Sequence, residues 1–205
     1  MAYSHSQIQL YKQCPRRYRY EKVDKFPIPA DEQKVNLYFP LGTAVHYALE
    51  MLYKGLRQKY IPMLESIQRH FKESREKEMT EILKKTWKSS IFELFQQEER
   101  EQTQQRGLQY ITRYYNHYHP CNAVICDGTE VTLWFDIQAG TKFQAKMDRF
   151  DIRDDTAYIV DYKTTRSLPK EDEDTIKQQL SLYALAVQQN YGDKISKFIS
   201  EKDKG

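Results

Sequence analysis

The 205-residue sequence predicts a mixed α/β fold of the α+β type, in which helices flank a small central mixed sheet and one helical insertion is present. Three observations predict this fold class. Residues 63–119 contain no proline, one glycine and many helix-forming residues. Residues 130–163 contain three consecutive strand-like runs, and residues 174–191 repeat apolar side chains at helical spacing.

The chain is expected to open with a short helix, for which Ser4 or Ser6 is the N-cap. Four prolines and a glycine between residues 15 and 42 predict turns and loops around short elements. A longer helix is expected after Gly42, and it carries His46.

The block 63–119 predicts two or three amphipathic helices, because apolar residues such as Ile67 and Phe71 recur at three- and four-residue intervals. Three tyrosines at four-residue intervals continue this spacing on the last helix, which Pro120 is expected to end.

The strand region begins after residue 123. β-Branched and aromatic residues predict strands over 130–137, 142–152 and 156–163, and Asp154-Asp155 predicts the turn before the third strand. The apolar run in that third strand is typical of a central strand that is buried on both faces.

A final amphipathic helix is predicted over 174–191. Its apolar face is expected to contain Ile176, Leu180, Tyr183 and Val187. The remaining segment, 193–205, is short and charged, and we expect a tail there.

Composition excludes several classes of protein. The sequence has 32 Lys+Arg and 29 Asp+Glu, and a net charge of +3 is too small to indicate nucleic-acid binding by itself. Its apolar runs are too short for a membrane-spanning helix, and the N-terminus lacks the apolar region of a secretory signal. The odd set of Cys14, Cys121 and Cys126 argues against a disulfide framework, so we expect a soluble protein of a reducing, cytoplasmic compartment.

The segment 12–25 is locally basic, and tyrosines alternate with its charges. This mixture can bind phosphates and stack on bases. It is equally consistent with a solvated helix face whose tyrosines lie at the edge. The segment alone leaves both interpretations open.

Charged residues at the ends of two predicted strands form the clearest chemical pattern. Asp161 and Lys163 point to the same face of the third strand, since side chains alternate. If the second and third strands form a hairpin, Asp148 lies close to Asp161. Two close carboxylates repel each other unless a cation lies between them, and such oxygen ligands suit Mg²⁺ or Mn²⁺. Lys163 could orient a water molecule or balance charge on a phosphoryl group.

The acidic-x-Lys pattern is common by chance, because Glu32-Gln33-Lys34 also matches it within a proline-flanked loop. The context favours Asp161 and Lys163 over that loop. They end an apolar strand, where Asp and Lys are otherwise unfavourable, and a second carboxylate lies on the preceding strand.

In its order of motifs the sequence resembles the PD-(D/E)XK nuclease superfamily, in its RecB-type branch. That branch includes the nuclease domains of bacterial helicase–nuclease complexes and the CRISPR-adaptation nucleases. The resemblance covers most of the chain and implies a restriction-endonuclease-like core. The five matching segments are 6–18 (Y-x-x-C-P-x-x-Y), 41–46 (G-x-x-x-H), 145–149 (G-x-x-D-R, with alanine in place of glycine), 159–164 (I-V-D-x-K-T) and 179–184 (Q-L-x-x-Y).

The resemblance implies roles for individual residues. Asp148, Asp161 and Lys163 would be catalytic, and His46, Asp148, Asp161 and the backbone carbonyl of Tyr162 would bind the metal ion. Nucleic acid would contact Gln179 and Tyr183, and we add Arg16, Arg17 and Tyr18 of the basic segment. Without the resemblance, a histidine such as His46 on an apolar helix is more often a hydrogen-bonded core residue.

Two features depart from the family. Several relatives hold an iron–sulfur cluster with four cysteines, of which Cys14 matches the first, but no cysteine follows Tyr183. Because four thiolates are usually needed, we expect no cluster in this chain. Further strands or loops also commonly follow the last helix in relatives, so the short ending is consistent with a piece of a longer polypeptide.

The predicted function is therefore that of a Mg²⁺- or Mn²⁺-dependent DNA nuclease, acting on DNA with single-stranded parts in repair, recombination or defence. A helicase or a larger parent polypeptide is the expected partner, and no membrane is expected. The alternatives are a non-catalytic nucleic-acid-binding module of the same fold, and an interaction domain with accidental motif matches. A single nuclease domain over 1–205 would consist of N-terminal helices with the basic segment (1–57), a helical insertion (58–120), the catalytic strands with the following helix (121–192) and a charged tail (193–205).

Overall fold

The computed structural model describes residues 2–26, 38–85, 90–121, 128–138, 140–164, 170–192, 195 and 197–204. The chain divides into two compact units. The first unit contains residues 1–27, 127–161 and 166–202, and the second contains residues 28–126, 162–165 and 203–205.

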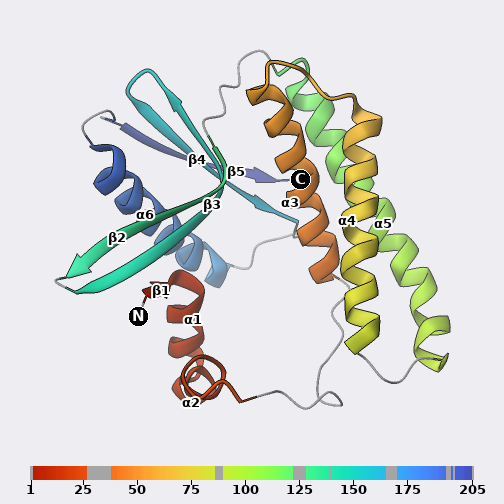
Figure 1. Ribbon diagram of the computed structural model, residues 1–205, viewed down its shortest axis with the longest axis horizontal. Coiled ribbons are helices and arrows are strands. Elements are labelled where there is room, and N and C mark those ends of the chain that lie inside the picture. The colour runs from red at the N-terminus through yellow and green to blue at the C-terminus, as the bar shows by residue number, and fades with distance from the viewer. Residues whose placement is uncertain are drawn as a thin grey trace. The chain divides into compact units, whose positions relative to one another are not determined.

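The first unit contains a mixed sheet. In the described part of the chain this sheet has five strands in the order β1-β3-β4-β5, with β2 also paired to β3 (Figure 1). In strand β4, the residues up to Asp161 belong to the first unit, and Tyr162 and Lys163 belong to the second. The strands are β1 (Ala2–Ser4), β2 (Gly128–Gln138), β3 (Thr141–Arg153), β4 (Thr156–Lys163) and β5 (Lys197–Lys204).

The register of the sheet confirms the predicted meander. Strands β2 and β3 pair antiparallel, and β3 and β4 pair antiparallel from Arg149↔Val160 to Arg153↔Thr156. The turn between β3 and β4 lies at Asp154 and Asp155, as predicted. Strand β1 adds a parallel pairing to the start of β3. Strand β4 lies between β3 and β5, which confirms its prediction as a central strand.

Helix α6 (Lys170–Tyr191) packs on this sheet and closes its core. The predicted apolar face is confirmed, since Ile176, Tyr183 and Val187 are buried. Removal of this apolar surface from water favours the packing. Near its C-terminal end the helix is hydrogen-bonded to β2. The Gln189 side chain accepts a hydrogen bond from Asp136 N–H at 3.0 Å and donates one to the Asp136 carbonyl at 2.7 Å.

The chain opens with α1 (His5–Gln13), which begins at a capping box. Ser4 Oγ accepts a hydrogen bond from Gln7 N–H, and the Gln7 side chain accepts one from Ser4 N–H. Ser4 is thus the N-cap, one of the two predicted. The short α2 (Pro15–Tyr18) follows, with Cys14 Sγ accepting from Arg17 N–H at 3.4 Å, and η1 (Arg19–Val23) completes this segment.

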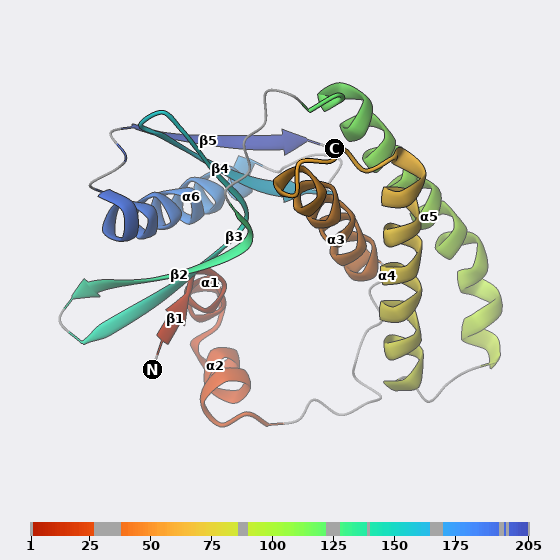
Figure 2. The same cartoon turned by 45° about the horizontal axis from the view of Figure 1, so that its top comes forward.

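The second unit is helical, and α3, α4 and α5 lie side by side in it (Figure 2). These are α3 (Tyr38–Arg57), α4 (Leu64–Lys85) and α5 (Ser90–Tyr118), so the described residues of the block 63–119 form two helices, where two or three were predicted. The Tyr53 and Tyr114 hydroxyls hydrogen-bond at 2.6 Å between α3 and α5. None of the helices in the described residues is long and apolar enough to cross a membrane.

Gly107, the single glycine of the block 63–119, lies where other side chains pack closely against α5. A Cβ at this position would collide with the buried ring of Phe71 and lie 2.8 Å from Leu41 Cδ1. We expect Gly107→Ala to lower the free energy of unfolding by about 1–3 kcal/mol through overpacking, measured by urea denaturation. The control is Gly42→Ala in α3, whose Cβ would meet only Thr164 Oγ1 at 3.6 Å. A Gly107→Ala protein as stable as the control would contradict this close approach.

Three segments differ from the sequence prediction. The predicted charged tail at 193–205 contains strand β5, whose short apolar pattern is interrupted by charges. Strand β1 was not predicted, because three residues carry no readable alternation. Helix α3 begins at Tyr38, before Gly42, since proline is tolerated in a first helical turn that needs no N–H donor. The predicted loop pattern Glu32-Gln33-Lys34 lies outside the described residues.

Candidate functional site

The two predicted aspartates of the first unit lie on neighbouring strands. Arg149 of β3 pairs with Val160 of β4, and the same register continued by one residue sets Asp148 opposite Asp161. Asp148 is half-buried, whereas Asp161 is only 5% exposed. Two carboxylates in this arrangement raise each other's energy unless positive charge is supplied.

Glu130 brings a third carboxylate to the same place, which the sequence did not predict. It lies between the register pairs Thr129↔Arg149 and Val131↔Met147, so β2 sets it opposite Asp148. One carboxylate oxygen of Glu130 lies within 4.8 Å of one of Asp148. In the sequence, Glu130 was indistinguishable from an acidic residue at the solvated start of a strand.

Gln179 and Tyr183 of α6 face this acidic group. Gln179 Nε2 donates a hydrogen bond to the Tyr183 hydroxyl at 2.7 Å, and Tyr183 is buried. Burial, the largest cause, and the charges of Asp161, Asp148 and Glu130 together raise the pKa of Tyr183 to about 12, although the hydrogen bond from Gln179 lowers it. The phenol therefore stays protonated at ordinary pH and can donate a hydrogen bond.

His46 and Tyr162 meet within the second unit. His46 Nε2 on α3 lies 3.0 Å from the backbone carbonyl oxygen of Tyr162, and the two rings meet edge to face. The Tyr162 ring also meets that of Tyr114 at a centroid distance of 5.7 Å. This contact would be made by a core histidine and by a ligand that shares a cation with the carbonyl, so the metal role of His46 stays a prediction.

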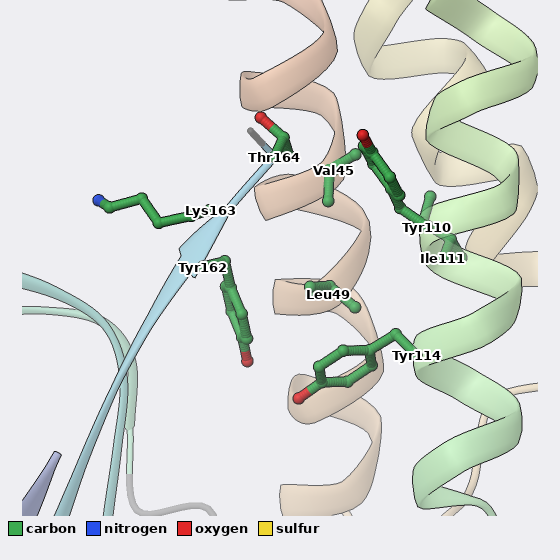
Figure 3. Close-up of a pocket in the computed structure, with 8 residues that line it drawn as sticks. All are labelled: Val45, Leu49, Tyr110, Ile111, Tyr114, Tyr162, Lys163 and Thr164. Carbon is green, nitrogen blue, oxygen red and sulfur yellow. The ribbon is translucent and has the colours of Figure 1, made fainter. Parts of the chain in front are cut away.

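Lys163 follows Tyr162 and extends in a different direction from the Tyr162 ring (Figure 3). It is half-buried and borders a mostly apolar pocket of the second unit. The pocket is lined by Val45, Leu49, Tyr110, Ile111, Tyr114, Tyr162, Lys163 and Thr164.

The predicted nucleic-acid contacts of the basic segment lie on α2, whereas the carboxylates lie on strands. Arg16 is exposed, and its Nε donates to the Tyr20 hydroxyl at 3.1 Å. Arg17 forms an ion pair with Glu21 at 2.5 Å. Tyr18 packs edge to face on Tyr11. Arg16 thus presents a cation on an exposed aromatic surface, while part of the charge of Arg17 is balanced locally.

The donor set of the first unit fits a hard divalent cation. Asp148, Asp161 and Glu130 offer carboxylate oxygens, the ligands that Mg²⁺ and Mn²⁺ prefer. A cation would also relieve the repulsion between the carboxylates of Glu130 and Asp148, whose oxygens lie within 4.8 Å of each other. The chemistry of these residues therefore agrees with the predicted cofactor.

Comparison with known proteins assigns the fold. A search of curated proteins finds no match to the chain. The family description of the PD-(D/E)XK nuclease superfamily matches residues 2–202. The mixed sheet flanked by helices agrees with the restriction-endonuclease-like core expected from the sequence. With the match extending over nearly all of its length, the chain belongs to the PD-(D/E)XK nuclease superfamily.

Proposed function

We propose that this protein is a Mg²⁺- or Mn²⁺-dependent nuclease of the RecB-type branch that cleaves DNA with single-stranded parts. The observation that carries the proposal is the set of Asp148 and Asp161 on paired strands, with Tyr183 in their electrostatic field, in a member of a nuclease superfamily. A role in DNA repair, recombination or defence, beside a helicase or within a larger polypeptide in the cytoplasm, follows from the same resemblance.

In this proposal Asp148 and Asp161 hold the cation, together with His46 and the carbonyl of Tyr162. The hydrogen bond of 3.0 Å between His46 Nε2 and that carbonyl oxygen holds the two proposed ligand atoms next to each other. When bound, the cation lowers the pKa of an attacking water and offsets charge on the phosphate.

The remaining residues act on the substrate. The Lys163 ammonium stabilises the charge that develops on the phosphoryl oxygens. The Tyr183 hydroxyl, oriented by Gln179, donates a hydrogen bond to the strand near the cleaved bond. Arg16, Arg17 and Tyr18 guide the strand through phosphate contacts and base stacking.

Cleavage assays with labelled DNA test this function. We expect Mn²⁺ or Mg²⁺ to support cleavage of linear single-stranded or partly single-stranded DNA, and an excess of chelator to abolish it. Matched RNA tests the choice of nucleic acid, and circular single-stranded DNA separates exonuclease from endonuclease action. Binding of DNA without cleavage under every metal condition would contradict the proposal and favour a non-catalytic binding module.

A further inference from the structure

We infer that Glu130 is an additional metal-binding residue of this site and that Lys146 competes with the cation for its carboxylate. The inference rests on the proposed function. Glu130 would be a fourth side-chain ligand, in addition to the predicted Asp148, Asp161 and His46. It lies on β2, which contains none of these three residues.

The strand register supports the first part. Glu130 lies opposite Asp148, with carboxylate oxygens within 4.8 Å of each other. Two oxygens that share one cation with bonds of about 2.1 Å lie at most about 4.2 Å apart. A small side-chain adjustment therefore brings both carboxylates onto one ion, without any change in the pairing of β2 and β3.

The field at Tyr183 gives a separate indication. Asp161, Asp148 and Glu130 all act on its phenol, so Glu130 belongs to the same acidic group as the two predicted aspartates. Glu130 therefore lies near enough to α6 to act on the same side chain as the two predicted aspartates.

Lys146 provides the counter-charge in this structure. Its Nζ lies 2.5 Å from Glu130 Oε2, and the lysine side chain is 62% exposed. The Glu130 side chain is 26% exposed, so water reaches the pair mainly at the lysine, and a partly solvated ion pair of this kind is weak and is easily exchanged. Because an ammonium and a divalent cation both bind the same carboxylate, replacing Lys146 with a neutral residue removes a competitor and strengthens metal binding.

The backbone conformation at Glu130 is unusual. Its φ of +51° lies in the left-handed region, which is unfavourable for glutamate, and the register of β2 with β3 is the same on both sides of it. Unfavourable backbone conformations of this kind are concentrated at functional sites.

The test is Mn²⁺ binding to the full chain without DNA, measured by calorimetry and by the electron paramagnetic resonance of free Mn²⁺. We expect Glu130→Gln to weaken binding about tenfold. Lys146→Gln is expected to strengthen it roughly two- to fivefold, because an exposed ion pair is lost as a competitor. The control is Asp136→Asn, an exposed acidic residue farther along β2. Thermal unfolding without metal checks that each variant is folded.

The outcomes separate this inference from the proposed function. If Asp148→Asn weakens Mn²⁺ binding but Glu130→Gln does not, the role of Glu130 is wrong and the nuclease site stands. If neither change affects binding, the metal site itself is wrong. Lys146→Gln keeps Glu130 intact, so weaker binding by that variant would contradict the competition even where Glu130→Gln fails to fold.

Discussion

Lys163→Met is expected to remain folded and to bind Mn²⁺, but to cleave DNA about 10²–10³ times more slowly. Methionine keeps most of the length of the side chain and removes the charge that would stabilise the phosphoryl group. Lys163 lies two residues after Asp161 on β4, so strand alternation directs both to one face. The measurement is the single-turnover cleavage rate at saturating Mn²⁺.

Two further variants serve as comparisons for Lys163→Met. Asp161→Asn is expected to lose cleavage and also to weaken Mn²⁺ binding, because it removes an anionic ligand. Lys142→Met, an exposed residue of β3, is expected to cleave at the original rate. Undiminished cleavage by Lys163→Met would show that the proposed mechanism is wrong.

Asp151→Asn is expected to lower the free energy of unfolding by about 3–5 kcal/mol. The Asp151 carboxylate is fully buried, and it lies 3.2 Å from Nε of the buried Arg149 and 3.4 Å from Nη2 of Arg153. Its neutralisation leaves the Arg149 charge in the protein interior without this carboxylate. Urea denaturation followed by circular dichroism measures the loss.

The control for Asp151 is Asp154→Asn in the exposed turn after β3. Asp154 has a φ of +55°, which asparagine also tolerates, so stability is expected to change by no more than about 0.5 kcal/mol. Adding Arg149→Met to Asp151→Asn is expected to recover part of the loss, since the buried charge is then removed. An Asp151→Asn protein as stable as the control would mean that this ion pair contributes little.

The sequence predicted the elements whose periodicity is long and regular. Strand β4 has the predicted bounds, and the two helices within 63–119 follow from their apolar spacing. Strands β1 and β5 were not predicted, because their formation depends on pairing with β3 and β4 rather than on local pattern. A three-residue strand and a charged segment contain no local sequence pattern that predicts a strand. A tail was therefore the expected structure of 193–205.

The part of the site that lies on two consecutive strands could be predicted from the turn between them. The hairpin through Asp154-Asp155 predicted that Asp148 and Asp161 lie close, and the paired residues of β3 and β4 extend to Arg149↔Val160, one residue before these aspartates. Glu130 could not be found in this way, because its place depends on the β2–β3 register and on an unusual backbone angle. The roles of His46 and Lys163 rest on the family motifs, and they stay predictions until the variants are measured.

The start of α2 gives the Cys14-Pro15 dipeptide a structural role of its own. The thiol caps α2 and the proline occupies its first turn, so this dipeptide favours helix formation without any metal. In a related sequence, a Cys-Pro dipeptide at this position is therefore accounted for by the helix start, and it does not by itself indicate a bound iron–sulfur cluster.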